Sequence, residues 1–206
     1  AIEFYFAALD KNVKPIIGLD AYLAPGSRTQ KGQNRDEIQK PNTRIVLLAQ
    51  NLDGYRNLCQ ISTIGYQEGF YYKPRIDYEV LGKYNEHLIA LSGGIRGEIA
   101  QSLLTEGKDA AFEKIKKLQA IFGDRFYLEL NRTGLPEWEV INPFLLESGE
   151  KLGIKCVATN DVHYIFTYIY FICSIFFLKV WMSNLSLAII IHQFENSRKA
   201  NMFYKI

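Results

Sequence analysis

The chain has few cysteines and histidines, and neither sign of charge is in large excess. Its 206 residues include three cysteines and three histidines, and 24 Lys and Arg against 22 Asp and Glu give a formal net charge of +2. The cysteines are too few and too widely spaced for a disulfide framework or a CxxC metal site, so a reduced compartment is the simpler interpretation. So small a net charge excludes the broad basic field of a typical nucleic-acid clamp.

Two further features are missing at the start of the chain. There is no basic segment followed by an apolar core and a cleavage site, so no secretory signal is visible and we expect a cytoplasmic protein. The chain opens without Met, inside an apolar helical pattern, and we therefore expect its amino end to be missing. The content of charged residues, 22%, excludes wholesale disorder.

The average composition hides two different parts. Residues 164–206 hold 11 of the 28 aromatic residues and carry a charge of +3, which leaves −1 for the first 163 residues. By length, residues 164–182 could span a bilayer with Lys179 as their only charge. However, Ile, Phe, Tyr, Lys, Asn and Ser dominate, and these residues have A/T-rich codons. This composition favours a frameshift, intronic or read-through product over a membrane anchor, so we expect residues 165–206 to be an unrelated hydrophobic tail.

Before this tail, predicted strands and helices alternate. Strands are expected at residues 15–23, 44–49, 87–91, 126–130 and 154–158, and helices at 1–9, 51–65, 78–84, 97–104, 109–122 and 136–152. The strands are nearly continuous apolar runs, which is typical of a parallel sheet covered on its faces. The predicted fold class is therefore α/β, and either an open sheet or a barrel would fit.

Polar residues follow several of these strands. Asp20 lies near the end of the first strand, and Asp161 and His163 follow the last, where carboxylate and imidazole groups could bind a divalent metal. The alternative, which spacing alone favours, is that Asp161 caps a turn and His163 is a partly buried polar residue. Residues 71–75 (YYKPR) could stack on single-stranded nucleic acid and neutralise it, but a structured surface loop is the favoured interpretation.

Taken in order, seven segments resemble one family. They are AIEFY, KPIIGLDAYLAPGSR, LLAQNLDGYRNL, GFYYKPRID, LIALSGG with RGEI, FGDRFYLEL and GIKCVATNDVHY, and the match runs from about residue 1 to residue 164. They are similar to the PHP (polymerase and histidinol phosphatase) domain at the amino end of bacterial DNA polymerase III alpha subunits. The resemblance implies an incomplete, distorted (β/α)7 barrel related to the TIM barrel and truncated at both ends.

The same resemblance implies a role in DNA replication. The parent alpha subunit is a DNA-directed DNA polymerase, a nucleotidyltransferase, whose catalytic domain is not part of this sequence. Its partners would be DNA, other replicase subunits and a possible proofreading subunit. In some family members the PHP domain is a 3′–5′ exonuclease containing Zn, Mn or Mg, and in others it is a scaffold without metal. A free-standing metal-dependent phosphoesterase is the alternative within the same superfamily.

The metal-binding positions of the family are only partly retained. Asp20 stands in place of the glutamate of a G-x-E-x-Y motif, and Asp161 and His163 retain the closing D-x-H motif. Arg44 and Gly94 stand where the family has histidine and cysteine, and the family's first metal motifs would precede residue 1. We therefore expect a degenerate metal site, no catalytic residue and no cofactor, with Arg44 paired to Asp20 or Asp161.

Overall fold

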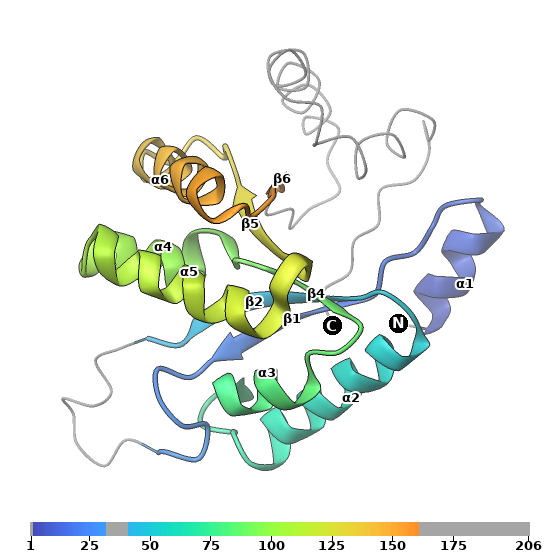
Figure 1. Ribbon diagram of the computed structural model, residues 1–206. Coiled ribbons are helices and arrows are strands. Elements are labelled where there is room, and N and C mark those ends of the chain that lie inside the picture. The colour runs from blue at the N-terminus through green and yellow to red at the C-terminus, as the bar shows by residue number, and fades with distance from the viewer. Residues whose placement is uncertain (1, 32–40, 161–206) are drawn as a thin grey trace.

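The computed structural model describes residues 2–31 and 41–160 (Figure 1). In chain order the elements are α1 (Ile2–Asp10), β1 (Gly18–Leu23), β2 (Thr43–Ala49), α2 (Leu52–Gln67), β3 (Arg75–Ile76), α3 (Tyr78–Tyr84), β4 (Leu88–Leu91), η2 (Gly94–Arg96), α4 (Glu98–Thr105), α5 (Lys108–Phe122), η3 (Gly123–Arg125), β5 (Phe126–Leu130), α6 (Trp138–Leu152) and β6 (Cys156–Ala158). Asp161, His163 and the predicted tail at 165–206 lie outside the described residues.

Six strands form one sheet in the order β3-β1-β2-β4-β5-β6. β1 pairs with β3, β4 with β5, and β5 with β6 in parallel, whereas β2 runs antiparallel to both β1 and β4. The prediction of a parallel sheet is therefore wrong for β2, although the mixed α/β class is confirmed. A continuous apolar run indicates that a strand is buried, but it does not indicate the direction of the neighbouring strands.

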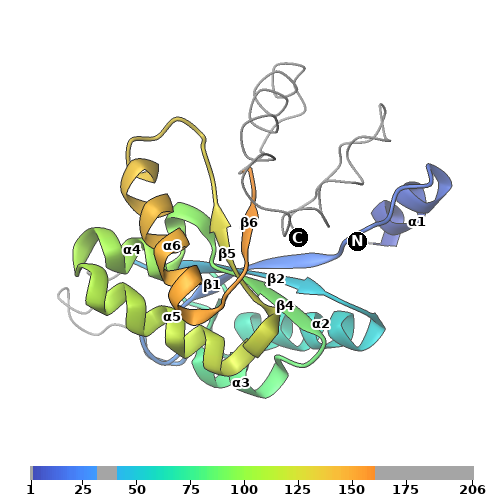
Figure 2. The same cartoon turned by 45° about the horizontal axis from the view of Figure 1, so that its top comes forward.

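The helices α2 to α6 lie along one side of the curved sheet, and α1 stands apart from them (Figures 1 and 2). Because successive side chains of a strand point to opposite faces, every second residue of each central strand enters the core. One hydrophobic cluster unites these residues with the helices, and it includes Ala21 and Leu23 from β1, Ile45 and Leu47 from β2, and Phe126 and Leu128 from β5. The remaining residues of these strands point to the opposite face of the sheet, which is turned away from the helices and is called here the inner face.

Helix boundaries follow from specific capping residues. Asn51 caps α2 by accepting a hydrogen bond from the Gly54 N–H at 3.0 Å. The helix expected at 109–122 begins one residue earlier, at Lys108, and its N-cap is Gly107, so Asp109 lies in the first turn and is not the cap. Pro143 lies inside α6 and does not mark its start.

Two local features, at β3 and at His87, differ from the sequence-based expectation. β3 was not predicted because its two residues carry no periodic signal, and its pairing with β1 places them in the sheet. His87, predicted to open a strand, instead lies in the turn before β4 with φ of 57°.

As for membrane association, no helix in the described part of the chain combines the length and hydrophobicity that a span requires.

Candidate site on the inner face of the sheet

An ion pair lies on the inner face, between β1 and β2. Asp20 and Tyr22 alternate with the core residues of β1, and the sheet register places Arg44 directly opposite Tyr22. Arg44 therefore sits diagonally across from Asp20, which lets its Nη1 reach the Asp20 Oδ2 at 3.1 Å. The two side chains are only 18% and 11% exposed. The predicted pairing of Arg44 with Asp20 is confirmed.

Tyr22 connects this ion pair to the segment before β3. Its hydroxyl oxygen accepts a hydrogen bond from Lys73 Nζ at 2.9 Å and a longer one from Arg44 Nη2 at 3.4 Å. Lys73 and Arg44 also lie 4.5 and 5.4 Å from the centre of the Tyr22 ring, where a cation is attracted by the π face. The hydrogen bond from Lys73 lowers the pKa of Tyr22, against burial that raises it, and Arg44 lowers it further.

A buried carboxylate lies at the carboxyl end of β5. Glu129 is 6% exposed, and its side chain accepts hydrogen bonds from the N–H groups of Gly93 and Gly94 and from the side chain of Thr159. Burial raises the pKa of Glu129, and the Asp20 carboxylate raises it further, whereas these three hydrogen bonds oppose the shift. Glu129 thus ties the turn after β4 to the ends of β5 and β6.

The turn after β4 has a backbone conformation at Gly93 and Gly94 that favours glycine at both positions. Both have positive φ, 83° and 61°, a region that other residues rarely adopt. A Cβ on Gly93 would also meet the Arg44 carbonyl oxygen at 2.2 Å, so the turn packs directly on β2. A Cβ on Gly94 would meet no atom within 4 Å. Gly94 therefore leaves open space at a position where the family resemblance implies a ligand, and it offers its N–H to Glu129 instead.

The described residues do not fit a metal ion. Within residues 2–31 and 41–160 there is no group of three or more His, Cys, Asp or Glu side chains that could bind one. The guanidinium of Arg44 cannot act as a ligand, and its positive charge beside Asp20 would repel a divalent cation. Asp161 and His163, the remaining ligands expected from the sequence, lie outside the described residues, so their contribution stays a prediction.

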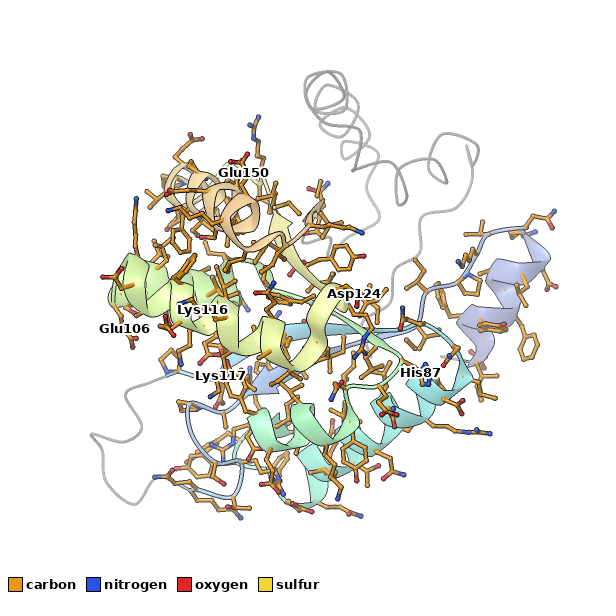
Figure 3. All side chains as sticks on the ribbon, viewed as in Figure 1. His87, Glu106, Lys116, Lys117, Asp124 and Glu150 are labelled. Atoms are coloured by element: carbon orange, nitrogen blue, oxygen red, sulfur yellow. The ribbon has the colours of Figure 1, made fainter. Side chains whose placement is uncertain are left out.

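The one histidine in the described residues lies elsewhere. His87 is exposed at the turn between α3 and β4 (Figure 3). Its carbonyl oxygen accepts from the Gln50 N–H at 3.0 Å, and its Nδ1 lies 3.2 Å from Asn51 Nδ2. His87 therefore supports the start of α2 and has no part in the inner-face site.

Sequence reasoning brought Asp20 and Arg44 together correctly but missed Glu129. The only sequence signal was an acidic residue inside an otherwise apolar strand, residues 126–130. An isolated acid in a strand is usually exposed, and burial of Glu129 depends on the neighbouring Gly93–Gly94 turn, which is distant in the sequence.

Comparison with known proteins defines the class to which this fold and site belong. The sequence pattern of the PHP domain matches residues 1–133, and the chain belongs to the PHP domain family. Three relatives share the name DNA polymerase III subunit alpha. Those from Deinococcus radiodurans and Aquifex aeolicus are 42% and 43% identical over 166 residues, and that from Thermus aquaticus is 42% identical over 165 residues.

These alignments include 79–80% of this chain but only 12–14% of the relatives' length. The chain thus corresponds to a small part of each relative, the part that contains the PHP domain.

Proposed function

We propose that this chain is the PHP portion of a DNA polymerase III alpha subunit and serves there as a structural module without a resident metal. The high identity with named alpha subunits supports the assignment to this polymerase. The observation that carries the structural role is the Arg44–Asp20 ion pair, because a fixed guanidinium takes the position in which the resemblance implies a metal ligand. The parent enzyme would carry out DNA synthesis in the cytoplasm, with DNA and other replicase subunits as partners.

The six-stranded sheet would then be part of a distorted (β/α)7 barrel. The described helices α2 to α6 lie along one side of the sheet (Figure 2), as they would on the outside of a barrel wall, and the inner face would then be turned toward the barrel interior. In this arrangement Asp20, Arg44 and Glu129 would form a charged layer inside the barrel. A proofreading subunit is a further candidate partner of such a module.

Metal analysis of the purified full chain tests the structural role. We expect Zn, Mn and Fe at well below one ion per chain, and no metal-dependent release of nucleotides from the 3′ end of single-stranded DNA. One tightly bound ion per chain, or metal-dependent nuclease activity, would instead support a phosphoesterase or 3′–5′ exonuclease. The Arg44→His variant should be measured beside the wild type, because imidazole can bind a metal ion that guanidinium repels. A higher zinc content in this variant would identify Arg44 as the residue that prevents metal binding.

A genomic test addresses the parent enzyme separately. We expect DNA on either side of this coding segment to encode the rest of an alpha subunit, in the same or another reading frame. Tail peptides from residues 165–206 found by mass spectrometry in a membrane fraction would contradict the interpretation of the tail as a read-through product.

A further inference from the structure

The turn between α3 and β4, which contains His87, packs closely on the start of α2. The His87 carbonyl oxygen accepts a hydrogen bond from the Gln50 N–H at 3.0 Å, and a Cβ added to Gly54 would lie only 2.2 Å from that oxygen. Further along α2, Asn57 Nδ2 donates to the Glu86 carbonyl oxygen at 2.9 Å. The backbone at His87 is therefore fixed against α2, and its imidazole lies beside the N-cap residue of this helix.

The side chain of Asn51 connects the helix cap to this imidazole. Its Oδ1 accepts a hydrogen bond from the Gly54 N–H at 3.0 Å, and its Nδ2 lies 3.2 Å from His87 Nδ1. Because the cap requires the amide oxygen to face the helix, the amide NH2 group must face the imidazole. An NH2 group can only donate, so Nδ1 of His87 must accept, and this requires a neutral imidazole with its proton on Nε2.

Protonation of His87 is incompatible with this arrangement. An imidazolium donates from both ring nitrogens, so Nδ1 would present a proton to the Asn51 NH2 group, which is itself a donor. If the Asn51 amide turned over to accept this proton, its NH2 group would face the Gly54 N–H and the cap would be lost. If it did not, the hydrogen bond that orients the cap would be lost instead. The ring is exposed to solvent protons, and histidine ordinarily titrates between about pH 5 and 8.

The surrounding charges do not offset the cost of protonating His87. Three acidic and three basic residues lie on the turn and the elements joined to it: Asp53 and Arg56 on α2, Lys83 on α3, Glu86 in the turn, and Asp124 and Arg125 on η3. Their charges cancel in sum, and Asp53 is already paired with Arg56 at 2.8 Å. No carboxylate within residues 2–31 and 41–160 forms an ion pair with the His87 imidazole, and the N-terminal end of α2 is itself positive.

We propose that His87 and Asn51 form a pH-sensitive switch: the neutral imidazole holds Asn51 in the capping orientation, and protonation of His87 releases the first turn of α2. The stability that depends on the neutral form is present above the ordinary titration range of histidine and is lost as pH falls through it. The response is local, because α3 has a different cap, in which Asp77 Oδ1 accepts from the Val80 N–H at 3.2 Å. The inference goes beyond the proposed function, since it requires neither the absence of a metal nor a particular parent protein.

Amide exchange of the isotopically labelled full chain, measured by NMR at about pH 7.5 and about pH 5.5, tests the switch. After correction for the intrinsic pH dependence of exchange, protection of the Gly54 amide should be lower at the acidic pH by at least about threefold, within the range expected for loss of an N-cap. The Val80 amide is the internal control, and its protection should change by less than about 1.5-fold because its cap does not involve a histidine. Equal protection of Gly54 at the two pH values, or an equal decrease at Val80, would overturn the proposal.

Two variants separate the switch from a purely structural role. His87→Asn keeps a residue type that tolerates the backbone of this position, with φ of 57°, but does not titrate, so the Gly54 response should disappear. Asn51→Asp keeps a capping oxygen but replaces the NH2 donor by a carboxylate, which accepts from the imidazolium, so protection of Gly54 should stay level or rise as pH falls. A Gly54 response that persists in His87→Asn, or that keeps its direction in Asn51→Asp, would contradict the proposal. Metal content affects neither result, so this inference and the proposed function can fail separately.

Discussion

Removing the charge of Arg44 should destabilise the fold more than removing the charge of Asp20. The atoms of this pair lie 3.1 Å apart, and both side chains are mostly shielded from water. Opposite charges centred about 4 Å apart at an effective dielectric constant of about 20 attract by about 4 kcal/mol before desolvation is counted. Since desolvation opposes this attraction, we expect the net cost of losing one partner to be lower, at most about 2–3 kcal/mol.

The two losses differ because of Glu129. Burial is the main cause that raises the pKa of Glu129, and repulsion by the Asp20 carboxylate adds a smaller contribution in the same direction. Arg44→Met would leave the Asp20 carboxylate buried without its guanidinium partner and its repulsion of Glu129 unopposed, and we expect this variant to lose about 2–3 kcal/mol of unfolding free energy. Asp20→Asn would remove the ion pair and this repulsion together, so its cost should be about 1 kcal/mol.

Urea denaturation of the full chain, followed by circular dichroism, measures these differences. In a double-mutant cycle with Asp20→Asn/Arg44→Met, the coupling energy should be about 1–2 kcal/mol. The exposed pair of Arg56 and Asp53, with side chains 68% and 63% exposed, is the control, and its cycle should give no more than about 0.5 kcal/mol. Equal costs for the two single variants, or a coupling energy no larger than that of the control pair, would refute the reasoning.

Three further predictions concern the turn, the buried acid and a helix cap. Gly97→Ala should destabilise the fold by several kcal/mol, because a Cβ would lie 1.9 Å from the Ser92 carbonyl oxygen. Gly82→Ala in α3 adds a Cβ that meets nothing within 4 Å and should stabilise the fold by about 0.5–1 kcal/mol. Thermal unfolding of the two variants measures this difference. Because the pKa of Glu129 is raised, the folded state holds its proton longer, so stability should fall as pH rises from the ordinary value of 4.5 through the folded pKa, and Glu129→Gln should flatten this part of a pH–stability profile; an unchanged profile would contradict the assignment. Asp77→Ala should cost about 2 kcal/mol in urea denaturation, because it removes the cap on the Val80 N–H and an ion-pair partner of Arg28; a decrease below about 0.5 kcal/mol would contradict this role.

Burial of the strands and the identity of the paired charges could be predicted from sequence. Arg44 stands at a metal-ligand position of the family, where the resemblance left Asp20 and Asp161 as its possible partners, and the structure shows the pair with Asp20. The direction of β2 could not be predicted, because apolar runs look alike in parallel and antiparallel strands. The role of Glu129 was hidden for a different reason: its partners are backbone N–H groups of glycines 35 or more residues away, and a backbone group leaves no signature in the sequence.

The same contacts explain how a PHP domain could keep this arrangement without an ion. A metal site gathers carboxylates whose mutual repulsion the metal offsets. Here Arg44 offsets the charge of Asp20, and the N–H groups of two adjacent glycines accommodate Glu129. Glycine at position 94 contributes to this, because its φ of 61°, which other residues rarely adopt, places its N–H toward Glu129.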